Sequence, residues 1–256
     1  MSMRPILVIG LNTFRENLRD KILYNLLLFA VMLMGASVLL ADLTIMEHHK
    51  IIKDMGLAAI NLGGVMIAVF VGIGLVSKEI ERRTVFTIMA RPISRAQFIV
   101  GKYFGLMITL SVNLAVMTAV FFMTLWLYRV PIQVSLFQAI ELIFVELLLV
   151  TAIALFFSTF SSSTLSAIMT LGIYVSGHLT ADMKGIAEKS QNELSTWFMT
   201  AWYYLCPNLE AFNIKGQAAT GIPISWNYQV LATGYGLIYA SLLVVSACAI
   251  FRRRDF

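Results

Sequence analysis

Six long apolar runs divide the chain, and charged or turn-forming residues bound each of them. The runs cover residues 22–41, 56–77, 103–126, 139–160, 165–180 and 229–251. A membrane-crossing helix needs about 20 apolar residues, so the pattern predicts an all-α protein with six transmembrane helices. The fifth run is short, and we expect its helix to begin among residues 161–164, whose hydroxyls can bond helix carbonyls.

The stretch before the first run has a different periodicity. Leu7, Leu11, Phe14 and Leu18 recur at helical spacing, whereas the charged residues between positions 15 and 21 take the other side. This pattern predicts an amphipathic helix over residues 1–21 that lies in the lipid headgroup layer. A cleaved signal peptide is the alternative, but the following apolar run is longer than a signal h-region and lacks a clear cleavage site.

Composition strengthens the membrane assignment. The chain is 59% hydrophobic and 13% charged, with a mean hydropathy of +0.82, whereas soluble domains carry about 25% charged residues. The net charge of +5 could suggest nucleic acid. Because the charges cluster at the ends of apolar runs, we instead interpret them as orientation signals for a bilayer and expect no nucleic-acid partner.

The distribution of basic residues predicts the orientation. With six crossings, one side receives the segments before the first crossing, after the last, and at residues 78–102. These segments hold 13 of the 19 Lys and Arg residues. Positive charge accumulates on the cytoplasmic side, so both termini are expected there. The whole of residues 1–256 is expected to form one transmembrane domain.

The segment 78–102 is the longest loop on that side. Pro92 biases Arg91 away from helical geometry, and Ser94 is suited to cap a new helix. The pattern predicts two short surface helices whose apolar side chains could dock into a protein groove. A solvated loop, basic only for orientation, is the alternative.

The residue pattern of this loop resembles that of type-2 ABC transporter permeases between their second and third spans. The matching residues are Glu79 and Glu81, then Arg83-Thr84, then Pro92 with Ser94-Arg95, then Gly101-Lys102. The amphipathic start, the six spans and the basic tail extend the resemblance over nearly the whole chain. Residues 203–209, with Phe212 and Asn213, are similar to the branch that includes the permease of the nitrous-oxide-reductase maturation system.

The resemblance implies a transport subunit of the bacterial inner membrane, with export more expected than import. It implies two copies of an ABC ATPase subunit and a second copy of this permease or a similar half. The loop would be the ATPase-coupling element, through the residues Glu79, Glu81, Arg82, Arg83, Thr84, Arg91, Pro92, Arg95, Gly101 and Lys102. No phosphate-binding loop of the GxxxxGK[ST] type is present in the chain. ATP and Mg are therefore expected on the partner, with no catalytic residue, cofactor or metal in this chain.

The segment 181–228, expected on the outer side, is rich in aromatic residues. Residues 196–205 are expected to form a short helix, and residues 216–225 a turn region. The resemblance implies re-entrant helices before the last span. Candidate gate residues are Trp197, Trp202, Tyr203, Tyr204 and Pro207. A plain belt of aromatic side chains at the headgroup level is an equally weighted alternative.

The fourth run contains two carboxylates, Glu141 and Glu146. Intramembrane carboxylates are costly and mark functional sites by default. Glu141 is close enough to the outer end to reach water, but Glu146 lies deeper. Five residues separate them, which places the two side chains on different helix faces. Glu146 is expected to bond a neighbouring helix, line a polar cavity or stay protonated.

The motif Glu47-His48-His49 invites a metal site, but adjacent histidines diverge on a helix. We interpret it as a polar outer loop. Two other functions remain open at this stage: a secondary transporter driven by an ion gradient, which would need buried charge pairs or broken spans, and a membrane assembly factor.

Overall fold

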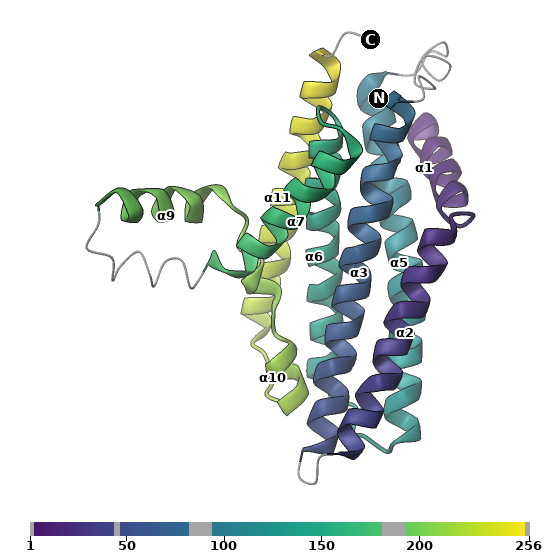
Figure 1. Ribbon diagram of the computed structural model, residues 1–256, viewed down its shortest axis with the longest axis vertical. Coiled ribbons are helices and arrows are strands. Elements are labelled where there is room, and N and C mark those ends of the chain that lie inside the picture. Colours follow the sequence, from purple (N-terminus) through teal and green to yellow (C-terminus); the bar gives the residue numbers. More distant parts are fainter. Residues whose placement is uncertain (1–2, 44–46, 82–93, 181–192, 254–256) are drawn as a thin grey trace.

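The computed structural model describes residues 3–43, 47–81, 94–180 and 193–253, and the regular secondary structure in these ranges is helical. The long helices stand side by side in one bundle (Figure 1). The elements are α1 (Met3–Asn17), α2 (Lys21–Asp42), α3 (His48–Glu81), α5 (Arg95–Leu127), α6 (Val134–Ser158), α7 (Ser163–His178), α9 (Glu193–Leu205), η1 (Glu210–Phe212), α10 (Lys215–Thr220) and α11 (Trp226–Arg253).

Five of these helices are long and apolar enough to cross a membrane. They are α2, α5, α6, the part of α3 from His48 to Gly74 and the part of α11 from Trp226 to Arg252. The prediction of membrane-crossing helices is confirmed for these five. Helix α7 has 16 residues and is therefore about 24 Å long, short of the roughly 30 Å of a bilayer core. The sixth crossing stays a prediction.

Helices α3 and α6 form the centre of the bundle, because they are far more buried than α2 and α11. Helix α3 packs against α2, α5 and α6, and α11 packs against α6 and α5. The first turn of α1 and the last turn of α11 lie at the same end of the bundle (Figure 1). The carboxyl end of α3 and the amino end of α5 also lie there.

Helix α1 packs lengthwise on the first half of α5. The contact depends on small residues, because a Cβ at Gly105 would lie 2.6 Å from the carbonyl oxygen of Gly10 and from Thr13 Cβ. Gly101 and Gly105 therefore let the two helices approach closely. Asn17 Nδ2 donates to Thr109 Oγ1 at 3.0 Å beside this contact. Leu7, Val8 and Leu11 of α1 are exposed, where they are free to meet lipid.

Local chemistry sets where several helices begin. Asp20 caps α2 by accepting a hydrogen bond from the Ile22 amide at 2.9 Å. The expected cap at Ser94 is confirmed, and Gln97 completes a capping box with it. The helix that Ser94 starts is not a short surface helix, however, because it continues through the third crossing as α5.

Two other expectations need correction. His48 and His49 form the first turn of α3 rather than a loop. Lys215–Thr220 is the helix α10, and the turn begins only at Gly221, whose φ of 79° ends that helix in the left-handed region. In both places the helix gains partners from neighbouring elements, α2 for α3 and both α3 and α6 for α10, which local composition does not reveal.

Candidate functional site

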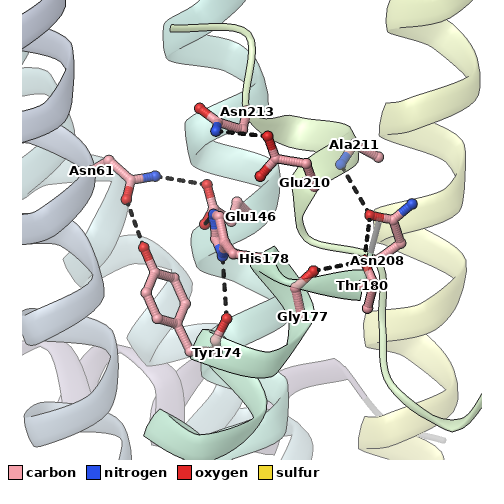
Figure 2. Close-up of polar contacts among 10 residues, drawn as sticks. All are labelled: Asn61, Glu146, Tyr174, Gly177, His178, Thr180, Asn208, Glu210, Ala211 and Asn213. Carbon is pink, nitrogen blue, oxygen red and sulfur yellow. Dashed lines mark hydrogen bonds and ion pairs between the residues drawn. The ribbon is translucent and has the colours of Figure 1, made fainter. Parts of the chain in front are cut away.

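A buried polar cluster lies where α3, α6 and α7 meet. Glu146 of α6 has no exposed surface, and its Oε2 accepts a hydrogen bond from Asn61 Nδ2 of α3 at 2.6 Å. The Tyr174 hydroxyl of α7 donates to Asn61 Oδ1 at 3.0 Å. His178 Nε2, one turn further along α7, lies 3.4 Å from Glu146 Oε1. Figure 2 shows the four side chains converging from the three helices.

The cluster lies at the middle of the membrane-crossing segments. Asn61 is the central residue of the span His48–Gly74, and Glu146 is the central residue of Val134–Ser158. Polar groups at this depth are costly unless they are paired. Asn61 uses its amide nitrogen toward Glu146 and its amide oxygen toward Tyr174, so it connects α6 to α7 through α3.

The contact between Glu146 and His178 requires a hydrogen. His178 Nδ1 lies 3.2 Å from the Tyr174 carbonyl oxygen, which can only accept, so Nδ1 carries the hydrogen. In the neutral ring Nε2 is then an acceptor that faces another acceptor, Glu146 Oε1. One shared proton, on the carboxyl or on the ring, turns this repulsion into attraction. Such a proton would satisfy both atoms, which have no hydrogen-bond partner among the described residues.

Helix α7 ends at this cluster. Beyond His178 the chain leaves the helix, and the segment 206–214 returns along its end (Figure 2). The Leu209 amide donates to the Gly177 carbonyl at 3.1 Å. The Thr180 hydroxyl lies 3.0 Å from the same carbonyl and 3.1 Å from Asn208 Oδ1. Non-helical backbone at membrane depth is tolerated only when its polar groups are satisfied inside the protein, as these are.

Helix α11 holds the segment 206–214 in place. The Asn208 amide donates to the Tyr235 hydroxyl at 2.9 Å, and the Tyr228 hydroxyl donates to the Ala211 carbonyl at 2.7 Å. Pro207 is buried, and its carbonyl oxygen would lie 2.8 Å from a Cβ added at Gly177. Movement of α7 would therefore move the segment 206–214 and pull on α11.

Glu141 belongs to a second cluster. Its carboxylate accepts hydrogen bonds from Gln229 Nε2 and, at 2.8 Å, from the Thr233 hydroxyl of α11. Gln138 Nε2 donates to Gln229 Oε1 at 2.8 Å and extends the cluster. The prediction that Glu141 and Glu146 face different ways is confirmed, because one faces α11 and the other faces α3 and α7. Glu141 does not simply reach water, since two side chains of α11 hold it.

The described part of the coupling set lies at the end of the bundle that holds both chain ends. Arg95 Nη1 lies 3.4 Å and 3.3 Å from the carbonyl oxygens of Phe251 and Arg252, where the carboxyl end of α11 favours a cation. Lys102 is buried, and its Nζ lies 3.7 Å from Glu16 Oε2 of α1. Gly101 packs against Ile9.

The other predicted coupling residues lie in the chain at the end of α3 or between α3 and α5. Glu79 and Glu81 lie in the last turns of α3. Arg82, Arg83, Thr84, Arg91 and Pro92 lie outside the described residues.

The candidate gate residues do not form one cluster. Trp197, Trp202, Tyr203 and Tyr204 lie on α9, which projects sideways from the bundle (Figure 1), and the Trp197 side chain is 71% exposed. Pro207 instead lies buried at the end of α7. The expected helix over 196–205 is confirmed and starts three residues earlier.

Sequence reasoning found Glu146 but missed its partners. Asn61 is a lone amide within the second apolar run, and Tyr174 and His178 stand four residues apart in the fifth. Such spacing places two side chains on one helix face, and this was the available signal. Which helix that face meets is a property of the tertiary structure.

Comparison with known proteins identifies one family. A family model described as "ABC-2 family transporter protein" matches residues 8–256. No curated protein matches the sequence significantly.

Proposed function

The chain belongs to the ABC-2 transporter family, and from this premise we propose that it is the permease subunit of an exporter powered by a separate ATPase. The carrying observation is the family match over residues 8–256 of a chain with five apolar helices of crossing length. As a permease component of an ABC transporter, the chain supplies the path through the membrane rather than the catalysis.

The ATPase docks on the segment 78–102 in this proposal. The two helix ends that this segment joins lie beside the first turn of α1 and the last turn of α11 (Figure 1). Contacts from Arg95 to α11 and from Lys102 to α1 support the proposal. They give the segment a base made of three helices, so a push on it would be passed to α1, α5 and α11 together.

Six crossings with both termini in the cytoplasm complete the topology. Helix α7 and the segment 206–214 together make the fifth crossing. The shared position of the two chain ends supports an even number of crossings. The 13 basic residues on that side support its assignment to the cytoplasm of a bacterial inner membrane. Two copies of the chain, or one copy and a similar half, would enclose the path between them, with two ATPase subunits below.

The moving part is the interrupted crossing. Nucleotide-driven closure can shift the permease only through contacts that differ between its two states. The Glu146 cluster connects α7 to the central helices α3 and α6, and Asn208 and Ala211 connect the following segment to α11. A tilt of α5 and α11 would thus displace α7 and, through α7, the helix α9.

The branch assignment and the outer gate are part of the same proposal. The residues 203–209 support a place near the permease of the nitrous-oxide-reductase maturation system. The outward position of α9, with its exposed Trp197, supports contact with the headgroup layer. This helix would then act as a re-entrant element beside the exit of the path.

A second candidate function follows from the shared proton. A buried Glu–His pair beside an interrupted crossing is the arrangement that ion-driven transporters use at mid-membrane. In that case transport would follow the proton gradient and would need no ATPase.

Affinity purification of the tagged protein in mild detergent, followed by an ATPase assay, tests the first proposal. The wild type is expected to bring down an ABC ATPase, and Glu81→Arg is expected to lose it, because charge reversal at a docking surface costs several kcal/mol. Asp54→Arg is the matched control, since Asp54 is exposed on the same helix near its other end.

The result that contradicts the proposal is absence of any ATPase with the wild type in several detergents, with normal membrane insertion. Proton-driven transport of a substrate in ATP-free proteoliposomes, lost in the Glu146→Leu variant, would then establish the second candidate function. Retention of the ATPase by Glu81→Arg would instead move the docking surface away from this residue.

A further inference from the structure

An open hollow lies at the end of the bundle opposite the two chain ends. It has a volume of about 480 Å³, and its lining residues are Glu47, His48, His49, Lys50, Lys53, Ala219 and Thr220. The first two turns of α3 make one wall, and the end of α10 makes the other. Neither the candidate site nor the proposed ATPase docking surface uses these residues.

The charge of Lys53 has no counter-charge here. Its side chain is only 3% exposed, and its Nζ donates to the amide oxygen of Gln133 at 3.1 Å. Among the described residues no carboxylate lies within ion-pair distance of this ammonium group. An ammonium group has three N–H donors, and one neutral amide oxygen satisfies a single one. Burying a charge without an opposite charge is costly, so the site favours an incoming anion.

The other charged side chains that line the hollow, Glu47 and Lys50, are paired with each other. Lys50 Nζ lies 3.0 Å from Glu47 Oε2, and His48 Nε2 lies 2.9 Å from Asp42 Oδ1. The pairing of Glu47 with Lys50 removes most of the repulsion that this carboxylate would exert on an anion. Lys53 therefore supplies the unbalanced charge of the site.

The backbone adds to the positive potential. The hollow lies at the amino end of α3, a helix of 34 residues. The amides of Lys50 and Ile51 donate to the Glu47 carbonyl, those of His48 and His49 have no acceptor among the described residues, and the helix dipole is positive at this end. A tetrahedral oxyanion can accept from such amides and from an ammonium group at once.

The depth of Lys53 indicates where its partner comes from. Lys53 lies eight residues from Asn61, the centre of the crossing segment, which corresponds to about 12 Å along the helix axis. Half of a bilayer core is about 15 Å. The ammonium group therefore lies just inside the headgroup boundary, within reach of a lipid phosphate at that surface.

We propose that this hollow is a phosphate-binding site, in which Lys53 and the first turn of α3 hold the phosphate group of an anionic phospholipid or of a free phosphate compound. The inference goes beyond the transport cycle, and its test needs no ATPase.

Thermal unfolding of the purified protein in dodecyl maltoside at low salt measures the binding. The probes are dihexanoyl phosphatidylglycerol, inorganic phosphate and, as the phosphate-free reference, dihexanoylglycerol. Ligands that bind the folded protein raise its Tm with concentration, which gives an apparent Kd for each probe. We expect stabilisation by a phosphate-bearing probe and none beyond the detergent baseline by dihexanoylglycerol.

Variants assign the effect to the hollow. Lys53→Gln is expected to weaken phosphate binding at least about tenfold, because it removes a charge-assisted hydrogen bond. Lys53→Arg keeps the charge and is expected to stay within a few fold of the wild type. Arg129→Gln is the matched control, because it removes an exposed charge at the same end of the bundle, outside the hollow.

Stabilisation by phosphatidylglycerol alone identifies a lipid headgroup, and equal stabilisation by inorganic phosphate identifies a free phosphate compound. Either result supports the site. Equal effects of dihexanoylglycerol and phosphatidylglycerol, with none from phosphate, would overturn it, as would an unchanged Kd in Lys53→Gln. If Lys53→Gln does not fold, the comparison of probes on the wild type still decides.

Discussion

Replacement of Glu146 tests the shared-proton arrangement in the centre of the bundle. Glu146→Leu keeps a similar volume but removes the acceptor of Asn61 Nδ2, which lies 2.6 Å from the carboxylate. It also removes the group that faces His178 Nε2 at 3.4 Å. A buried polar group left unsatisfied costs about 1–3 kcal/mol, so two such groups are expected to cost about 2–6 kcal/mol.

Glu146→Gln is the informative counterpart. Its amide oxygen can accept from Asn61, and its amide nitrogen can donate to His178 Nε2, the acceptor of the neutral ring. If the pair holds its proton on the carboxyl, glutamine reproduces both contacts, and the cost is expected to stay below about 1 kcal/mol.

Unfolding in dodecyl maltoside, titrated with SDS and followed by circular dichroism, measures both variants. Glu146→Leu is also expected to lower the Tm by about 5–15 °C. Equal and large losses in Glu146→Gln and Glu146→Leu would refute a proton on the carboxyl. That result would indicate a carboxylate paired with an imidazolium ring, because breaking a buried ion pair costs about 3–5 kcal/mol. No loss in either variant would show that the cluster contributes nothing to stability.

Two further predictions concern the packing of α1 and the orientation of the bundle. Gly105→Val is expected to cost about 1–3 kcal/mol by overpacking and to make α1 more sensitive to protease, because its Cβ would lie 2.6 Å from Thr13 Cβ. Gly172→Val is the control, since a Cβ there meets nothing within 4 Å, and equal protease sensitivity of the two variants would contradict the packing. Asp54→Cys is expected to react with an impermeant maleimide in whole cells, whereas Arg252→Cys reacts only after lysis; the reverse pattern would invert the proposed orientation.

The five apolar helices of crossing length could be predicted from the sequence, whereas the sixth crossing stays a prediction. Hydropathy is a sum over consecutive residues, and a helix in a bilayer satisfies its backbone internally. The runs 22–41, 103–126 and 139–160 thus located α2, α5 and α6 closely. The cap at Ser94 could also be predicted, because a capping box depends only on residues three positions apart in the sequence.

A predicted helix boundary was wrong where a neighbouring helix stabilises the end of the helix. His48 and His49 are polar enough for a loop, but α2 lies beside them and gives His48 a partner in Asp42. The fifth run was located well, because its helix begins at Ser163, within the expected residues 161–164, and ends at His178, two residues before the end of the run.

The sequence by itself determined a membrane protein with apolar helices of crossing length, one deep carboxylate and a basic end. These are sums or spacings along the chain, and they need no knowledge of which helix faces which. Only the tertiary structure decided that Glu146 meets Asn61 and His178, and that Lys53 lies buried with no carboxylate of the described residues at ion-pair distance. The cost of a buried polar group depends on its distance to partners that are 32 to 85 residues away in the chain, and that distance is set by helix packing.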